Sequence, residues 1–521
     1  MHVGIVGGGI SGLSAALLLQ REGHRVTIYQ ASGRLGGRIY THRFGKREDG
    51  TAPYFEAGAM RIPRSPLHEN VYSLVRCLNT HNFPDMKVNL IPYILEHENN
   101  KAFMNGQKLA IDDASWATVL QLPEPYRGKS ARTLLGEVVG PWVKLLRQDF
   151  EAGFRQLLAY DEYSFRQYLR MHANWPHEVV EFVEVATSQT NQYDLSFTEL
   201  IMQNLDFDTE HWCTVEGGMS NLVDACANLI GCDNIRLHSL VSGIFERSDD
   251  RVEFEIEGVC GRTRAFDKVI LAIPTAALHG IRERPTWSFM KEQSLRGSWF
   301  EPLYKMGLHF HTRFWETGPA PCFGGQSTTD LRFRWIVYPS DHIGCPGPGV
   351  LLLYCWMSDA LKWGSLSREQ RVDLALHDLS KYFADQEVDV YDQYIESFDV
   401  LWSAEQAGGD AMFLPGQFSR FFEVARKPEK NIYFAGEHLS KHHTWISGAL
   451  DSVLTTVRQM TGEDVPALGQ EYVAKPPRDG ISNEATRLTD VLKSKVKFKA
   501  SALYSSLIIP SHLNVQYVDV V

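Results

Sequence analysis

The chain has 521 residues, 44% of them hydrophobic and 22% charged, and 52 Lys and Arg against 63 Asp and Glu leave a formal net charge of −11. These proportions exclude a disordered or fibrous protein. The acidic balance also argues against nucleic-acid binding, because a protein of that class carries a basic domain or stripe.

The eight cysteines form no CxxC pair and show no metal-ligand spacing, so we expect reduced thiols and no bound metal. No apolar run approaches the ~18 residues that a membrane-spanning helix needs. A strand expected at His2–Val6 leaves no room for a signal peptide. We therefore expect a cytoplasmic protein, although a trimmed precursor would have the same sequence.

The amino-terminal segment predicts a dinucleotide-binding unit. The strand His2–Val6 leads through a glycine cluster into a helix closed by Gly23, and a second strand follows at His24–Tyr29. The glycines match the G-x-G-x-x-G fingerprint, which combines a tight turn, a close approach to pyrophosphate and a helix amino terminus. The cofactor-binding residues expected here are Gly7, Gly9, Ser11 and Gly12.

The second strand ends at Gln30, where this fingerprint normally has an acid. An amide can accept one hydrogen bond and donate another, so Gln30 could hold the ribose without charge assistance. The alternative is that Gln30 faces solvent at the end of the strand.

Two distant segments resemble the flavin amine oxidase superfamily. Ser32–Arg38 is similar to its R-x-G-G-R segment, and Asn431–His438 is similar to its closing flavin strand. The resemblance implies FAD as the cofactor, with the backbone passing close to the pyrophosphate and the flavin ring. The residues that it assigns to FAD in these segments are Arg34, Gly36, Gly37, Arg38, Gly436 and Glu437.

The segment Phe55–Pro63 resembles the G-x-M-R-I-P segment of the L-amino-acid oxidase branch. In that branch the arginine, here Arg61, binds the substrate α-carboxylate. The resemblance covers roughly residues 1–462 and implies that Lys305 lies near flavin N5 and that Tyr354 shares the carboxylate. It also implies flavin contacts at Gly58, Ala59, Met60, Arg61, Val241, Trp445 and Ile446.

Residue chemistry supports these roles independently. An arginine fork matches a carboxylate in a bidentate way, and a tyrosine hydroxyl adds a second donor that helps to fix the Cα–H bond. The alternatives are a structural ion pair for Arg61, a surface position for Lys305 and a core position for Tyr354.

The predicted helical region departs from its relatives at Gln203. Some L-amino-acid oxidases place there a histidine proposed as the base for the substrate ammonium group, and an amide cannot take that proton. Deprotonation would then fall to water, to an anionic neighbour or to solvent before binding.

Two further residues are expected to line the substrate side chain. A carboxylate at Asp410 beside the indole of Trp356 suits a cationic side chain, which favours L-arginine, L-lysine or L-ornithine. A large aromatic amino acid stacked on Trp356 is the alternative, and Asp410 could also be a turn residue after two glycines. The adjacent His442 and His443 are not expected to bind metal, because neighbouring residues face different ways.

We expect an α/β protein with a discontinuous Rossmann-type FAD-binding domain, a mixed-sheet substrate-binding domain and a helical insertion. The expected ranges are 1–63, 209–278 and 406–462 for the first, 66–115 and 290–400 for the second, and 116–207 for the third. A tail, 463–521, follows, in which Leu492–Lys499 predicts a strand with a lysine-lined face.

The sequence therefore predicts an FAD-dependent L-amino-acid oxidase, in which hydride passes from Cα to flavin N5, O2 becomes hydrogen peroxide, and the imino acid hydrolyses to 2-oxo acid and ammonia. We expect a homodimer. The alternatives are an amino-acid monooxygenase that forms an amide, an amine oxidase, and a flavin-binding protein without catalysis.

Overall fold

The first parallel sheet begins with the predicted strand–helix–strand unit. In the computed structural model, which describes residues 1–45, 52–403 and 408–469, β1 (His2–Val6) leads into α1 (Ile10–Arg21) and β2 (Arg25–Tyr29). The two strands pair in parallel, with His2 opposite Arg25. The chain can reverse after α1 because Gly23 takes a left-handed backbone conformation, with φ +79°.

This sheet has five parallel strands in the order β10-β2-β1-β13-β19. The added strands are β10 (Ile235–Arg236), β13 (Lys268–Leu271) and β19 (Ile432–Phe434). The sheet thus joins three stretches that lie far apart in the sequence. The hairpin β11 (Val241–Glu246) and β12 (Val252–Ile256) lies between β10 and β13 in the chain, and β11 and β12 pair in antiparallel fashion.

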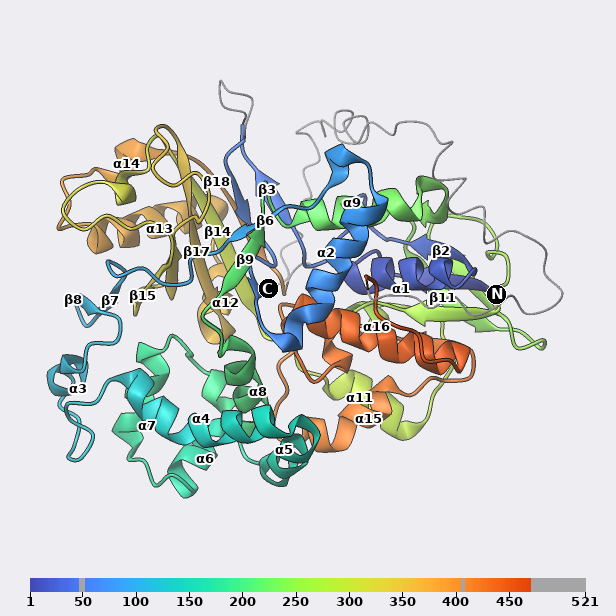
Figure 1. The fold of residues 1–521 in the computed structure, drawn as a ribbon, viewed down its shortest axis with the longest axis horizontal. Coiled ribbons are helices and arrows are strands. Elements are labelled where there is room, and N and C mark those ends of the chain that lie inside the picture. The colour runs from blue at the N-terminus through green and yellow to red at the C-terminus, as the bar shows by residue number, and fades with distance from the viewer. Residues whose placement is uncertain (46–51, 404–407, 470–521) are drawn as a thin grey trace, which may run out of the picture. The chain divides into compact units, whose positions relative to one another are not determined.

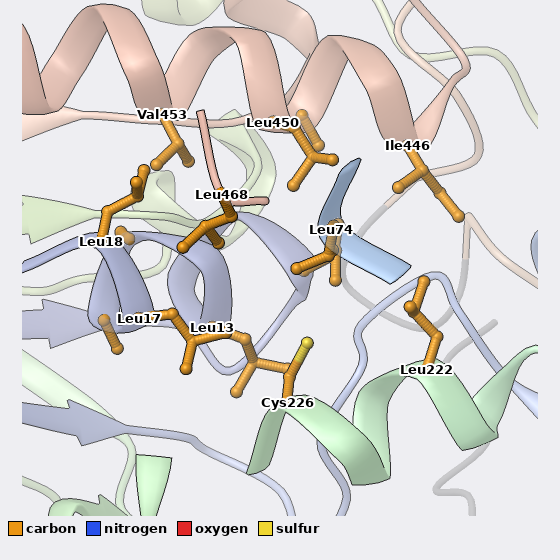
Figure 2. Packing of buried hydrophobic residues seen from close by; sticks show 14 of the residues in the cluster. Leu13, Leu17, Leu18, Leu74, Leu222, Cys226, Ile446, Leu450, Val453 and Leu468 are labelled. Atoms are coloured by element: carbon orange, nitrogen blue, oxygen red, sulfur yellow. The ribbon is translucent and has the colours of Figure 1, made fainter. Parts of the chain in front are cut away.

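Four helices form the main core beside this sheet. Figure 1 shows α1 together with α2 (Glu69–His81), α9 (Ser220–Ile230) and α16 (Ile446–Thr461). Figure 2 shows part of this core, in which Leu13 of α1 lies beside Cys226 of α9, and Leu74 of α2 and Leu450 of α16 belong to the same cluster. Because each fully buried leucine contributes roughly 1.5–3 kcal/mol, this packing fixes the loops at the helix ends.

The second large sheet has seven strands in the order β18-β14-β17-β16-β15-β7-β8. Its strands are β7 (Lys101–Met104), β8 (Gln107–Ala110), β14 (Leu303–Phe310), β15 (Gln326–Thr329), β16 (Trp335–Val337), β17 (Gly349–Trp356) and β18 (Tyr394–Leu401). All pairs are antiparallel except β15 with β7. Every residue of β14, which lies between β18 and β17, is buried.

Two smaller sheets connect to these elements. One pairs β3 (Thr41–Arg43) with β4 (Tyr54–Glu56), and the other has the order β5-β9-β6. The bounds of its strands are β5 (Ile62–Pro63), β6 (Leu90–Pro92) and β9 (Trp212–Val215). Arg61 directly precedes β5, so the pairing of β5 with β9 sets its position.

The stretch between β8 and β9 is helical, as its periodicity predicts. Its helices, drawn from blue through teal to green in Figure 1, are α3 (Ser115–Val119), α4 (Ala131–Gln148), α5 (Phe150–Leu157), α6 (Phe165–Met171), α7 (His177–Ala186) and α8 (Phe197–Phe207). Ser130 caps α4 by accepting a hydrogen bond from the backbone of Thr133. The remaining helices are α10 (Thr275–His279), α11 (Phe289–Gly297), α12 (Met357–Gly364), α13 (Arg368–Tyr382), α14 (Val390–Gln393) and α15 (Glu423–Arg426).

The described residues belong to one compact unit, so the division into three domains stays a prediction. None of the helices in the described ranges is long and apolar enough to cross a membrane. The strand predicted at Leu492–Lys499 lies outside the described residues.

Candidate active site

The glycine turn between β1 and α1 is held by very close backbone packing. A Cβ on Gly12 would lie 2.0 Å from the carbonyl oxygen of Gly7, and a Cβ on Gly7 would lie 2.4 Å from that of Ala272. Gly7 also has φ +106°, a conformation that favours glycine. The backbone packing of the protein therefore requires glycine at both positions, whether or not a cofactor is bound.

Gly9 differs, because a Cβ built on it would meet no atom within 4 Å. Gly9 caps α1, whose first turn contains Ser11 and the backbone N–H groups that precede the hydrogen-bond ladder of the helix. The second glycine pair approaches from the other side: Gly36 N–H donates to the Gly8 carbonyl (2.8 Å), and Gly37 lies beside Gly9. Open space above a helix amino terminus fits a pyrophosphate.

Gln30 has a role in the structure that its sequence position did not indicate. Its Oε1 accepts a hydrogen bond from Gly8 N–H (2.8 Å), and its Nε2 donates to Ser32 Oγ (2.7 Å). The amide therefore fixes the glycine turn, and the predicted ribose contact would have to share these atoms. Val241, expected at the adenine edge, is buried at the start of β11 in a core cluster that also contains Tyr29.

Arg38 and Glu437 form an ion pair that joins the two predicted flavin segments. Arg38 Nη1 lies 2.5 Å from Glu437 Oε1 and also donates to the Gly409 carbonyl (2.9 Å). Burial alone would raise the pKa of Glu437, but the charge of Arg38 and a hydrogen bond from Thr444 N–H hold it at about 2. Glu437 is thus an anion at neutral pH and anchors the segment before Trp445.

Most of the other residues predicted to contact the flavin pack closely against neighbouring parts of the chain. The guanidinium of Arg34 donates to the carbonyls of Leu35 and Ile39, each at 3.2–3.3 Å. A Cβ on Gly58 would lie 1.9 Å from the Arg38 carbonyl, and a Cβ on Gly436 would lie 2.5 Å from the His438 ring. Ala59 donates its N–H to the Arg38 carbonyl (2.9 Å), and Met60 is buried in the cluster around Trp402.

Lys305 lies at the centre of β14 with its ammonium group buried. Its Nζ donates to the Gly58 carbonyl (2.6 Å) and lies 4.5 Å from the centre of the Tyr354 ring. Burial lowers the pKa of Lys305 to about 7, and the nearby charge of Arg61 adds to the effect. Lys305 therefore sits in the interior, as the family resemblance implies, and not at the surface.

Arg61 is buried, with 8% of its surface exposed, and has no acidic partner in the part of the chain that the structure describes. Among the described residues, its side chain makes one hydrogen bond, a long one of 3.4 Å to the amide oxygen of Gln326. Aromatic rings enclose the guanidinium, with centroids 5.1–5.9 Å from Cζ; they belong to Tyr93, Phe207, Trp212 and Trp335. Since a buried charge is costly unless it is paired, this arrangement fits an anionic ligand.

Strand register places Tyr354 next to Trp335, one of the aromatic rings around Arg61. Tyr354 lies opposite Lys305 on β14 and opposite Trp335 on β16, so the three side chains project from one face of the sheet. Burial raises the pKa of the Tyr354 phenol well above its ordinary value, which keeps the phenol a hydrogen-bond donor. Arg61, Tyr354 and Lys305 are thus brought together, although the chain separates the first and the second by almost 300 residues.

Trp356 and Asp410 lie near the same face. Trp356 packs edge-on against Trp335 (4.7 Å) and Tyr354 (5.0 Å), and its buried Nε1 has no acceptor in the described chain. Asp410 is half-buried, and burial, with the charge of Glu437, raises its pKa to about 6. The carboxyl of Asp410 has no hydrogen-bond partner among the described residues, as expected of a group that faces a ligand.

Glu301, which sequence reasoning missed, is buried beside Asp410. Its backbone N–H donates to the Asp410 carbonyl (2.9 Å), and its Oε2 accepts from Gln192 Nε2 (2.9 Å). Burial and the charge of Asp410 raise the pKa of Glu301 well above its ordinary value. No sequence motif indicates this pair, because Glu301 and Asp410 lie far apart in the sequence and come together only in the folded chain.

Trp445 directly precedes α16, which begins at Ile446. The indole of Trp445 packs on Phe207 (5.3 Å) and Trp212 (5.9 Å), two of the rings around Arg61. The tryptophan predicted to flank the flavin therefore borders the aromatic rings around Arg61. Gln203 lies on α8, one turn before Phe207, and its Oε1 is buried without a hydrogen-bond partner in the described chain.

The sequence pattern of the flavin-containing amine oxidoreductases matches residues 10–461. The chain belongs to this family. It is therefore a flavin-dependent oxidoreductase, and FAD is the cofactor, as the sequence predicted. The open space over Gly9, the free first turn of α1 and the Arg38–Glu437 pair fit this cofactor.

Several relatives of this flavin oxidoreductase carry more specific names. A putative L-amino-acid oxidase, YobN, of Bacillus subtilis is 30% identical over 466 residues, which cover 87% of this chain and 92% of that protein. L-amino-acid oxidase 4 of Hebeloma cylindrosporum is 29% identical, with 88% and 81% covered. A putative bifunctional amine oxidase of Dictyostelium discoideum is 31% identical over 88% of this chain, but this chain spans only 46% of that protein.

Solved structures confirm the fold class. A putrescine oxidase variant superposes with a TM-score of 0.67 at 18% identity, over 88% of this chain and 98% of that one. Cyclohexylamine oxidase from Brevibacterium oxydans IH-35A gives a TM-score of 0.65 at 18% identity, again over 88% and 98%. At this identity the likeness concerns the fold alone.

Proposed function

We propose that this flavin-dependent oxidoreductase is an L-amino-acid oxidase. The observation that carries the proposal is Arg61, a buried guanidinium without an acidic partner in the described chain, enclosed by aromatic rings. An amine offers such a group nothing to pair with, whereas an amino acid offers a carboxylate. The names of relatives at about 30% identity agree with this choice.

In the proposed reaction the protein positions the substrate. Arg61 and the Tyr354 phenol bind the carboxylate, and the aromatic rings around them exclude water and strengthen the charge pairing. FAD, when bound, supplies the acceptor for the hydride from Cα and passes the electrons to O2, which gives hydrogen peroxide. The imino acid then hydrolyses to 2-oxo acid and ammonia. Lys305, held by the Gly58 carbonyl, places a proton donor at this face.

For the side chain of the substrate, Asp410 and Trp356 favour a cation. Two neighbouring acids, Asp410 and Glu301, have no ion-pair partner within the described ranges, and the aromatic face of Trp356 suits a cation as well. We therefore place L-lysine, L-arginine and L-ornithine first, and large aromatic amino acids second. Asp410→Asn should reduce kcat/KM for the basic substrates and leave that for L-phenylalanine nearly unchanged.

The test is anaerobic bleaching of the FAD-loaded protein by each of the twenty L-amino acids and by the amines that lack their carboxylate. Bleaching by L-amino acids and not by the matching amines supports the proposal. Bleaching by amines alone would identify an amine oxidase, and no bleaching would leave a flavoprotein without this chemistry. In air, a yield of peroxide equal to substrate consumed separates an oxidase from a monooxygenase, which forms an amide.

A further inference from the structure

One buried carboxylate, that of Asp206, faces two histidines from distant parts of the chain. Asp206 is the penultimate residue of α8 and is only 1% exposed. Its Oδ1 lies 2.9 Å from Nδ1 of His442, which belongs to the segment before α16, and 3.6 Å from Nε2 of His68, which ends the 3₁₀ helix before α2. These three residues, the Asp206 cluster, connect α8 to the amino-terminal ends of two other helices.

The two histidines of the Asp206 cluster differ in charge. Burial lowers the pKa of His68 to about 4, an effect that Asp206 opposes and His442 strengthens, so His68 is neutral at neutral pH. Its Nδ1 lies 2.8 Å from Ser447 Oγ, and a serine hydroxyl that donates there leaves the Nε2–H of His68 directed at Asp206. Burial alone would also lower the pKa of His442, but the charge of Asp206 and their hydrogen bond raise it above its ordinary value. His442 is therefore the cation that pairs with the carboxylate.

Other charged groups act on His442 from its own segment and from α16. Asp451 of α16 raises the pKa of His442, and Lys441, the preceding residue, lowers it. The ammonium of Lys441 is itself paired with Glu151 of α5 (2.8 Å). Among the charges, that of Asp206 has the largest effect on the pKa of His442. The charge of His442 thus depends mainly on its contact with Asp206.

The Asp206 cluster borders the aromatic rings around Arg61. Phe207, the residue after Asp206, places its ring 5.1 Å from the guanidinium carbon of Arg61 and 5.3 Å from the indole of Trp445. The ring of His68 packs edge-on against the same indole, with 5.2 Å between ring centres. Two of the side chains that pack on Trp445 are therefore next to Asp206, one in the chain and one in space.

The Asp206–His442 pair also anchors the backbone that leads to Trp445. Between His442 and Trp445 lies Thr444, which has φ +70°. A β-branched residue keeps this left-handed conformation only where its surroundings hold it. The N–H of Thr444 donates to Glu437 Oε2 (3.0 Å), which is one anchor, and the pair with Asp206 is the other. Loss of either anchor would allow the segment to relax and the indole to move.

We propose that Asp206 is a positioning residue for substrate binding. Through the two histidines of its cluster it fixes Trp445 and Phe207 at the edge of the proposed carboxylate site. The inference rests on the proposed L-amino-acid oxidase function and deepens it. Because the pairing requires a protonated His442, substrate affinity should be full below the pKa of this histidine and should fall as pH rises through it. Substrate binding is thereby coupled to the binding of a proton at the Asp206 cluster.

The test measures the affinity of the FAD-loaded protein for a carboxylate ligand without an α-amino group, because the charge of such a ligand is constant between about pH 6 and about pH 9. The ligand is 3-phenylpropanoate for an aromatic substrate or 6-aminohexanoate for a basic one, and perturbation of the flavin spectrum gives its Kd. In Asp206→Asn the ligand should bind roughly 10-fold more weakly at about pH 6, the lower value for one hydrogen bond to a charged group. At about pH 9 the difference should be small, because the wild type has then lost the pair as well.

Comparing each variant with the wild type at the same pH isolates the Asp206 cluster. Lys305, whose pKa lies at about 7, also titrates in this range and affects the binding of an anion, but it does so in both proteins. The ratio of the two Kd values removes its influence. His442→Gln should give the same dependence of the ratio on pH, and it provides the test if Asp206→Asn does not fold. A ratio that stays constant with pH, or that shows no weakening, would overturn the proposal.

Glu199→Gln is the matched control. Glu199 is a second buried acid of α8, and its Oε2 lies 2.7 Å from Nδ1 of His443. The ring of His443 packs against Phe413 (4.4 Å) and Phe418 (5.0 Å), so this pair borders other aromatic rings than those of the proposed carboxylate site. Glu199→Gln should lower the thermal midpoint as Asp206→Asn does but bind the ligand as the wild type does. If both variants weaken the ligand equally, the role of Asp206 is only structural and the proposal is wrong.

A double-mutant cycle tests whether Asp206 acts through the indole. In a Trp445→Phe background, Asp206→Asn should weaken the ligand clearly less than it does in the wild type, whereas additive effects would contradict this route. The wild type alone decides the proposed function. If no L-amino acid bleaches its flavin, that function fails. If L-amino acids bleach it and the variants show no pH-dependent ratio, only the role of Asp206 fails.

Discussion

Replacing Arg61 by methionine should separate substrate binding from stability. In the unliganded protein, the guanidinium makes one hydrogen bond of 3.4 Å and four ring contacts. The ring contacts contribute roughly 0.5–1 kcal/mol each, and the desolvation of a buried charge costs several kcal/mol. The two effects nearly cancel, and methionine retains the apolar stem. We therefore expect a thermal midpoint within about 2 °C of the wild type.

Substrate affinity should respond very differently. Removing one partner of a buried charged pair costs about 2–5 kcal/mol, which corresponds to a roughly 30- to 5,000-fold higher dissociation constant for the amino acid. Titration of anaerobic flavin bleaching measures this constant, and the flavin content shows whether FAD is retained. The result should be a stable yellow protein that the substrate no longer reduces at ordinary concentrations.

Arg313→Met is the control for this experiment. Arg313 is as buried as Arg61, but its guanidinium is paired with Glu316, with Nε 2.7 Å from Oε1. Breaking a buried pair costs about 3–5 kcal/mol, so this variant should unfold at a clearly lower temperature and bind substrate normally. If Arg61→Met loses as much stability as Arg313→Met, or if its substrate affinity is unchanged, the assignment of Arg61 to the carboxylate is wrong.

Three more variants follow from the same geometry. Gly9→Ala should leave the unfolding midpoint of the apoprotein unchanged but reduce its FAD content, whereas Gly12→Ala should lower both, because only the second Cβ meets protein; equal effects would contradict a cofactor in the open space. Lys305→Met should slow reoxidation by O2 in stopped-flow experiments more than anaerobic reduction, and the reverse order would place the lysine elsewhere. Burial alone would lower the pKa of His443, but Glu199 raises it. The pair therefore stabilises the fold fully below the ordinary histidine pKa of about 6.5, and this contribution is lost as pH rises through the raised pKa. Glu199→Gln should accordingly lower the unfolding midpoint more at about pH 5.5 than at about pH 9, and a larger loss at the higher pH would refute the pairing.

The sequence predicts well where the backbone itself imposes a requirement. Gly12 is recognisable because the carbonyl that its Cβ would meet belongs to Gly7, five residues earlier, and Gly7 is recognisable because the turn needs its positive φ. Gln30 shows the limit of such reasoning. Its position predicts a ribose contact, which stays a prediction, but gave no sign that its amide also accepts a hydrogen bond from Gly8, 22 residues earlier in the chain. Only the parallel pairing of β1 and β2 brings these two residues together.

The proposed carboxylate site could be predicted only from the family resemblance, for a physical reason. Arg61 and Tyr354 meet because β5 pairs with β9 and β14 pairs with β17, and neither register can be read from local composition. Glu199 and His443 are 244 residues apart, and nothing near either residue indicates the other. Tertiary packing determines which distant residues meet. The sequence can therefore identify candidate site residues, but only the folded structure shows which of them lie together.

The positions of Arg61 and Lys305 also connect substrate binding to the proton balance of the site. The charge of Arg61 is, after burial, the largest influence that lowers the pKa of Lys305 to about 7. In the proposed complex, a carboxylate bound to Arg61 would neutralise that influence, so we expect the pKa of Lys305 to rise when substrate binds. At neutral pH we then expect the lysine to be more fully protonated in the complex than in the free protein. A group that gains its proton on substrate binding is ready to stabilise negative charge that develops later in the reaction, at the face where Gly58 holds it.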